Sequence, residues 1–393
     1  IDREDIFDEI IEESRRLDTE LDETTSVGQQ SQITTLIKTN SKLRKQITDI
    51  ANLNEVVDVV LRDCFSTIDA RRYDNYTSYS EVLSPVDDED EVMMVDIGDM
   101  HYGAALEPEE VDGMNVYNVD ICRKRLFTLR DSIIDIVEDR RRSTGIQDLY
   151  VNFLGDIVDG ECIFKGQEFE IDVYGLEQIM EGADILAQFL AELSCYFREI
   201  KVRAVMGNHG RGGPKGQHST TMNWDLFVYR IMKYGLKEFV NIEYHISKFA
   251  YILYEATPGF IHAVLHGDSI QGYKGLPYYG IDRAIYKINT ATEQNIKAFH
   301  IGHFHTTARL SPDRDIFLNG SFVGTGKLAA NKMFLGSPPK QWCMGIHPTK
   351  GITWTQPIAL EPKYQYELGP NSIYMGPFTD KRNPMGLTEY LGI

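Results

Sequence analysis

Seven residues of the kinds that bind metal ions recur through the middle of the chain, each shortly after an apolar run. They are Asp99, His101, Asp156, Asn208, His266, His303 and His305. Taken singly, such a residue is more often a helix cap, a turn residue or an ordinary histidine than a ligand. Five polar blocks in succession, each at the end of an apolar run, indicate one shared site.

The donor atoms of these residues indicate a two-metal centre. Carboxylate and amide oxygens mixed with imidazole nitrogens suit Mn²⁺, Fe²⁺ or Zn²⁺, and we expect two divalent ions with Mn²⁺ favoured. Two ions about 3.5–4 Å apart need a bridging ligand, for which a carboxylate is best suited. We assign this catalytic role to Asp156. The ions would hold a hydroxide as the nucleophile and neutralise the oxygens of a phosphate.

His209 is the candidate proton donor, and therefore a second catalytic residue. A leaving alkoxide needs a proton, and an imidazole that is not itself a ligand can supply it. His209 directly follows the candidate ligand Asn208. We therefore expect its ring to lie beside the metals.

The segment after His209 is rich in glycine and carries Arg211 and Lys215. A flexible basic loop can contact phosphate groups without reading bases, and Tyr102 could stack on an unpaired base. These three are the candidate substrate-binding residues. The alternative is a solvated loop and a structural tyrosine.

Strands and helices must position these side chains. The five apolar runs lie at 92–95, 149–154, 202–206, 261–265 and 298–301. Apolar residues at helical spacing lie between some of them, at 176–197 and 224–232. This alternation predicts an α/β fold with a partly parallel sheet. In such folds ligands bind beyond the carboxyl ends of the strands.

Composition divides the chain into three parts. Residues 1–85 combine helix-like apolar spacing with polar linkers, and we expect a helical N-terminal appendage that could form a homodimer or contact a partner protein. A helix-turn-helix that grips DNA is the alternative there. Residues 91–360 are expected to form the catalytic domain, and residues 361–393, rich in Pro, Gly and Tyr, a C-terminal tail.

Composition also limits the classes of function. Apolar residues make up 42% and charged residues 25%, which are ordinary globular values and exclude a largely disordered chain. No run approaches the ~18 apolar residues of a membrane span, and the five cysteines are scattered, so we expect a soluble cytoplasmic protein that contacts no membrane. The net charge of −19 counts against a passive nucleic-acid binder, though less so if acids bind cations.

At the five blocks the sequence resembles the calcineurin-like metallophosphoesterase superfamily, over about residues 91–330. The resemblance implies a β-sandwich of two mixed sheets flanked by helices. One ion would be held by Asp99, His101, Asp156 and His305. The other would be held by Asp156, Asn208, His266 and His303. His209 matches the family's transition-state histidine, and the family spacing favours Asp99 over Asp96 as the first ligand.

Two blocks favour a nuclease within this superfamily. Residues 99–103 are similar to the opening block of SbcD-type DNA-repair nucleases, and residues 155–160 with 166–168 to the small exonuclease subunit of archaeal D-family DNA polymerases. Gly210 departs from the acid that many members carry after Asn-His. The resemblance implies a metal-dependent phosphodiesterase that acts on DNA as an exonuclease. The alternatives are hydrolysis of a small phosphoester such as a cyclic nucleotide, or of a phosphoprotein, and a non-catalytic scaffold.

Overall fold

The computed structural model describes residues 38, 89–111, 115–214, 219, 221–270, 277–310, 314–327 and 337–361. The chain divides into two compact units, residues 1–67 and 68–393, and apart from the helical residue Lys38 every described residue belongs to the second. The predicted appendage at 1–85 and the predicted tail beyond Glu361 lie outside the described residues.

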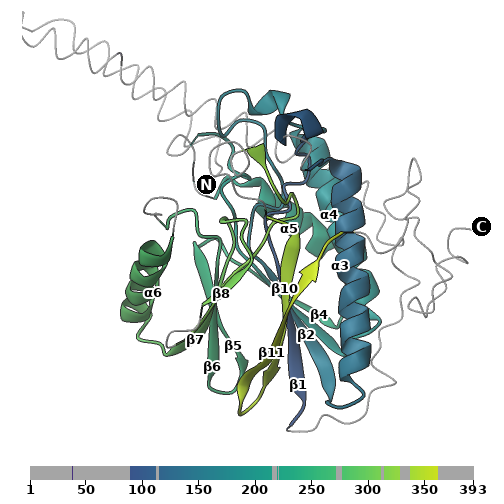
Figure 1. Cartoon of the computed structure of the whole chain (residues 1–393), viewed down its shortest axis with the longest axis vertical. Coiled ribbons are helices and arrows are strands. Elements are labelled where there is room, and N and C mark those ends of the chain that lie inside the picture. Colours follow the sequence, from purple (N-terminus) through teal and green to yellow (C-terminus); the bar gives the residue numbers. More distant parts are fainter. Residues whose placement is uncertain are drawn as a thin grey trace, which may run out of the picture. The chain divides into compact units, whose positions relative to one another are not determined.

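Two mixed β-sheets form the centre of the second unit (Figure 1). The six-stranded sheet has the order β11-β10-β1-β2-β3-β4, with β1 (Glu91–Ile97), β2 (Ile146–Phe153), β3 (Glu199–Ala204), β4 (Ile242–Ile246), β10 (Lys340–His347) and β11 (Gly351–Ala359). Strands β1, β2, β3 and β4 are parallel to one another, whereas β10 runs antiparallel to β1 and to β11. The carboxyl ends of β1, β2 and β3 therefore meet at one edge.

The five-stranded sheet has the order β5-β6-β7-β9-β8, with β5 (Tyr251–Thr257), β6 (Phe260–Leu265), β7 (Ile296–Ile301), β8 (Ala308–Leu310) and β9 (Asp315–Leu318). Strands β6, β7 and β9 are parallel, and β5 and β8 pair antiparallel at the two sides. Both sheets are thus mixed, which confirms the expected fold class.

Helices cover the outer faces of the two sheets. The described helices are η3 (Pro108–Val111), α3 (Val119–Arg140), η4 (Gln167–Phe169), α4 (Gly175–Ser194), α5 (Trp224–Gly235) and α6 (Tyr278–Thr292). α3 and α4 lie on the side of the six-stranded sheet, and α6 lies along the five-stranded sheet (Figure 1). Apolar side chains of α6, Ile281 and Ile285 among them, pack on β6, β7 and β9. The helices predicted at 176–197 and 224–232 are α4 and α5.

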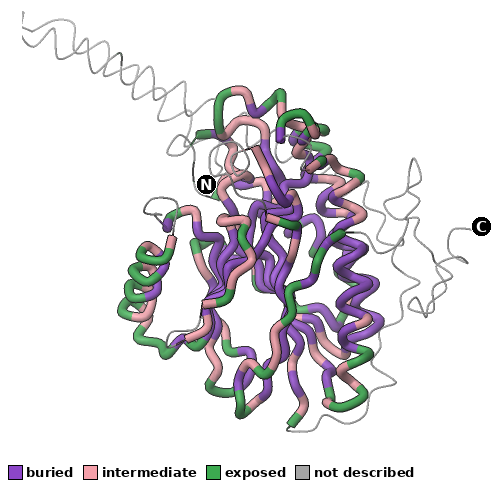
Figure 2. The backbone as a smooth tube through the Cα atoms, viewed as in Figure 1, coloured by how far each residue is buried: buried purple, intermediate pink, exposed green. Residues whose placement is uncertain are grey.

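The core between the sheets explains why the predicted runs are almost continuously apolar. Parallel strands that are covered on both faces bury nearly every side chain, as the purple strands of Figure 2 show. Met94, Tyr150 and Met344 of the six-stranded sheet pack against Ala298 and Phe317 of the other. Burial of these apolar side chains holds the two sheets together, so that the strand ends of one sheet stay close to those of the other.

A chain of polar side chains also crosses this core. Asp96 accepts hydrogen bonds from Asn152 Nδ2 at 2.8 Å and from the His300 ring at 2.7 Å. His300 Nε2 lies 3.0 Å from His262 Nδ1, and the Tyr254 hydroxyl donates to Asn152 Oδ1 at 2.8 Å. Asp96, the competing first ligand, is therefore bonded inside the sandwich.

Within the described ranges, none of the helices has both the length and the apolar character needed to cross a membrane.

Candidate metal centre

The predicted ligands come from both sheets and lie just beyond strand ends. Asp99 and His101 follow β1, Asp156 follows β2, Asn208 follows β3, His266 follows β6, and His303 and His305 follow β7. The Asp99 carboxylate accepts the backbone N–H of His303 at 2.9 Å, so the loops after β1 and β7 are bonded to each other. The structure thus brings residues 206 positions apart in the chain, 99 to 305, into one site.

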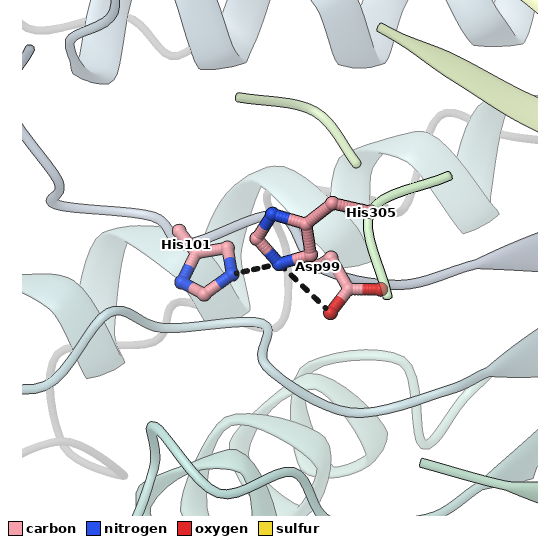
Figure 3. Close-up of side chains that lie close together, drawn as sticks. All are labelled: Asp99, His101 and His305. Carbon is pink, nitrogen blue, oxygen red and sulfur yellow. Dashed lines mark hydrogen bonds and ion pairs between the residues drawn. The ribbon is translucent and has the colours of Figure 1, made fainter. Parts of the chain in front are cut away.

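One cluster consists of Asp99, His101 and His305, whose potential ligand atoms all lie within 4.8 Å of one another. Figure 3 shows the three side chains pointing toward a common point. The two imidazole Nε2 atoms are 3.1 Å apart, and His305 Nε2 is 3.4 Å from Asp99 Oδ1. This grouping contains three of the four residues expected to hold the first ion.

A second cluster consists of Asp156, His266 and His303. His266 Nε2 lies 3.0 Å from Asp156 Oδ2 and 3.1 Å from Asn208 Oδ1. The other ring nitrogen of His266 donates to the Leu154 carbonyl at 2.8 Å, which directs Nε2 into the site. This grouping contains three of the four residues expected to hold the second ion, and the fourth, Asn208, contacts His266.

Asp156 lies between the two clusters. Its carboxylate also groups with His101 and His209, so it is near ligand atoms of both predicted ions. Asp156 is buried, and its Oδ2 receives no hydrogen bond from the described residues although His266 Nε2 is 3.0 Å away. A buried anionic oxygen without a donor is costly, and a cation would satisfy it. The oxygen and nitrogen donors therefore fit two divalent cations.

Backbone strain is concentrated at these residues. Among the described residues, six non-glycine residues have a positive φ, and five of them are predicted ligands: Asp99, His101, Asp156, His303 and His305, with φ between 48° and 70°. This left-handed conformation is disfavoured for side-chain-bearing residues and typically costs about 1–3 kcal/mol each. Such strain persists where the surrounding structure aims a side chain at a functional site.

Two glycines let the loops after β2 and β3 approach closely. A Cβ on Gly155, which has a φ of +86°, would lie 2.3 Å from the backbone nitrogen of Gly207. A Cβ on Gly207 would lie 2.1 Å from Asp156 Oδ1. The Gly-Asp and Gly-Asn-His blocks thus need glycine for packing, because only glycine has the space.

His209 lies at the edge of both clusters and is linked to Asp159. His209 Nδ1 is 3.0 Å from the Asp159 carbonyl and 3.1 Å from its carboxylate. The backbone N–H of His209 donates to Asp156 Oδ1 at 2.6 Å. Burial lowers the pKa of His209, but the carboxylates of Asp156 and Asp159 outweigh it and raise this pKa to about 9. In the metal-free site these two carboxylates therefore favour the protonated ring, the form that a general acid needs.

Asp159 is a functional residue of this site that was not predicted from the sequence. Its Oδ1 accepts from His101 Nδ1 at 2.9 Å, so the Nε2 atom of that ring faces His305. Asp159 therefore orients both a candidate ligand and the candidate proton donor. The signal was present in the sequence, since Asp159 stands three residues after Asp156.

The three predicted substrate-binding residues have different outcomes. The prediction that Tyr102 stacks on a base is wrong, because its side chain is fully buried and its hydroxyl donates to Glu181 at 2.6 Å. Arg211 lies two residues after His209 and is ion-paired with Asp268. Lys215 lies outside the described residues. Contact of Arg211 and Lys215 with substrate stays a prediction.

No protein-family model and no curated protein matches the chain. Solved structures of low similarity include Vps29 from Cryptosporidium parvum, with a TM-score of 0.31 and 10% identity over 69% of this chain and 100% of that one. A dimetal phosphatase from Danio rerio has a TM-score of 0.34 and 10% identity, over 69% of this chain and 99% of that one. Vps29 from Entamoeba histolytica, solved with Zn²⁺, has a TM-score of 0.27 and 13% identity, over 68% of this chain and 99% of that one.

Proposed function

We propose that this protein is a calcineurin-like metallophosphoesterase that uses two divalent metal ions to hydrolyse phosphodiester bonds of nucleic acid, as a DNA exonuclease. The observation that carries the proposal is the pair of ligand clusters joined at Asp156, with His209 at their edge. Mn²⁺ is the favoured metal because carboxylate, amide and imidazole donors are mixed, and Fe²⁺ or Zn²⁺ fit the same donors.

The residues of the chain have separate tasks in this reaction. When bound, the two cations activate a water nucleophile and neutralise charge on the phosphate. One cation would be held by Asp99, His101 and His305. The other would be held by Asn208, His266 and His303. Asp156 would contribute to both. His209, held by Asp159, is placed to give a proton to the departing oxygen. Arg211 would contact a substrate phosphate after leaving Asp268.

Hydrolysis of a small phosphoester, such as a cyclic nucleotide, is the second candidate. The net charge of −19 favours it, because a polyanion is repelled by an acidic surface. The pairing of Arg211 with Asp268 favours it too, since this pair leaves the guanidinium neutralised.

A cytoplasmic location is part of the proposal, because the described cysteines Cys122, Cys162, Cys195 and Cys343 are free thiols.

The test compares substrates on the Mn²⁺-loaded full chain. End-labelled single- and double-stranded DNA, bis(p-nitrophenyl) phosphate and p-nitrophenyl phosphate are incubated in parallel, with Asp156→Asn as the matched control. We expect release of nucleotides from DNA and no activity in the control, because a neutral amide bridges two cations poorly. Turnover of the small esters with intact DNA would support the second candidate. Inactivity of the metal-loaded protein on all four substrates would reject both and leave a scaffold.

A further inference from the structure

Asp225, in the first turn of α5, connects two of the ligand loops. Its carboxylate is fully buried. One oxygen accepts the backbone N–H groups of Asp156 at 3.0 Å and Gly207 at 2.8 Å. The other accepts those of Ile157 at 3.0 Å and Val158 at 3.3 Å. A single side chain thus bonds the loop that carries Asp156 to the loop that carries Asn208.

The loop after β2 forms an anion-binding concavity around this carboxylate. Successive backbone N–H groups converge on an anion when one residue of the turn is left-handed. Asp156 has a φ of +50°, and its N–H and the next two point at Asp225. Asp225 therefore stabilises the strained conformation that turns the Asp156 side chain toward the two ligand clusters.

Two further bonds attach the start of α5 to the loop after β3, and a third caps the helix itself. Asn223 donates to the Gly207 carbonyl at 2.8 Å and accepts the Asp225 N–H at 2.9 Å. The Trp224 N–H donates to the Gly210 carbonyl at 2.5 Å. A Cβ on Gly210 would lie 2.5 Å from Asn223 Oδ1 and 3.1 Å from Asp225 Cγ. Glycine at 210 thus leaves room for Asp225 to reach both loops.

We propose that Asp225 is a positioning residue that holds the bridging carboxylate of Asp156 and the amide of Asn208 at the spacing two cations require. The proposal rests on the metal-dependent function proposed above, but not on its substrate. Both oxygens of Asp225 already accept two N–H groups each, so a carboxamide cannot replace the carboxylate. Its NH₂ group would face two backbone donors.

The test measures Mn²⁺ affinity of the full chain by isothermal titration calorimetry after removal of metal with a chelator. Asp225→Asn should bind Mn²⁺ about 10–100-fold more weakly than the wild type, the usual cost of losing a partner behind the ligands. The matched control is Asp131→Asn, which alters a buried acid of α3 that is ion-paired with Arg130. Thermal unfolding in chelator reports stability for each variant separately.

Each outcome decides the proposal. A folded Asp225→Asn with wild-type affinity overturns it, and so does an equal loss of affinity in Asp131→Asn, because the effect would then be general destabilisation. If Asp225→Asn does not fold, Gly210→Ala replaces it, since the added Cβ displaces Asn223 and Asp225 and should weaken binding in the same direction. Unchanged affinity there overturns the proposal. A wild type that binds two ions but hydrolyses nothing rejects the proposed function alone, and one that binds none rejects both.

Discussion

At the scale of single residues, the surroundings of His209 differ from those of the candidate ligand His266. Its ring packs edge-on against His101, with centroids 4.4 Å apart, and its Nδ1 faces Asp159. His266 instead directs Nε2 between Asp156 and Asn208. His209 is also 24% exposed, whereas His266 is 2% exposed. A proton donor must reach the departing group of a substrate, and this exposure suits that role.

His209→Ala should lower the rate on DNA by about 10²–10⁴-fold, the usual contribution of general acid catalysis. The loss on bis(p-nitrophenyl) phosphate should be much smaller, because nitrophenolate leaves without a proton. Steady-state rates on both substrates and metal content by atomic emission check this. His245→Ala, at an exposed position of β4, is the control. Equal losses on both substrates would reject the acid role, and loss of one ion would reject the ligand assignment.

At the scale of elements, the same strands carry both the site and the hydrogen-bonded polar side chains in the core beneath it. Asp96 lies on β1 three residues before Asp99, and His300 lies on β7 three residues before His303. The Asp96–His300 contact at 2.7 Å therefore joins the same two strands that supply the first cluster. Next to it, His262 Nδ1 bonds His300, while its Nε2 is buried and has no hydrogen-bond partner among the described residues.

The His262 ring should make the unfolding free energy depend on pH. Burial, reinforced by the neighbouring His300, holds the pKa of His262 well below its ordinary value of 6.5. The unfolded chain therefore binds more protons than the folded chain below about pH 6.5, and stability falls as the pH falls through this window. One such group contributes up to about 1.4 kcal/mol per pH unit.

Denaturant unfolding of the metal-free protein between pH 7.5 and 5 measures this dependence. His262→Phe should reduce the slope of unfolding free energy against pH below 6.5, and His245→Phe should leave it unchanged. Chelator is present throughout, so that titration of the metal ligands is common to all three proteins. Parallel slopes in wild type and His262→Phe would show that this ring does not titrate on unfolding.

At the scale of the whole molecule, the two sheets and their helices occupy a defined part of the chain. The described strands run from Glu91 to Ala359. Contacts at both ends join flanking residues to this body, since Glu89 pairs with His347 at 2.9 Å and Glu361 with Arg125 at 3.3 Å. Assignment of residues 1–85 as an appendage, with a role in dimer or partner contacts, stays a prediction.

A variant that begins at Glu89 should fold, bind two Mn²⁺ ions and hydrolyse bis(p-nitrophenyl) phosphate as fast as the full chain, because the sandwich has its own core. Circular dichroism, metal content and initial rates, each beside the full chain, check this. An aggregated or metal-free product would mean instead that residues 1–88 cover an apolar face or complete the site.

The residue types of the site and their places at strand ends could be predicted from the sequence. Each candidate ligand stands within a few residues of its own apolar run, so chain geometry alone puts it at a strand end. The glycines before Asp156 and Asn208 were part of the recognised blocks, but the reason for them is a long-range contact, the close approach of the loops after β2 and β3. Helices α4 and α5 were predictable as well, because their apolar spacing is regular.

Only the tertiary structure decided which residues meet. Whether strands form one sheet or two depends on pairings between distant segments, and the residue patterning left this open, whereas the family resemblance implied two. Tyr102 follows a strand as the ligands do, yet it is buried against Glu181 of α4, a contact that local sequence does not encode. Asp225, 69 residues from the Asp156 N–H it accepts, carried no motif at all. The local chain determines the donor atoms, and long-range packing determines their partners.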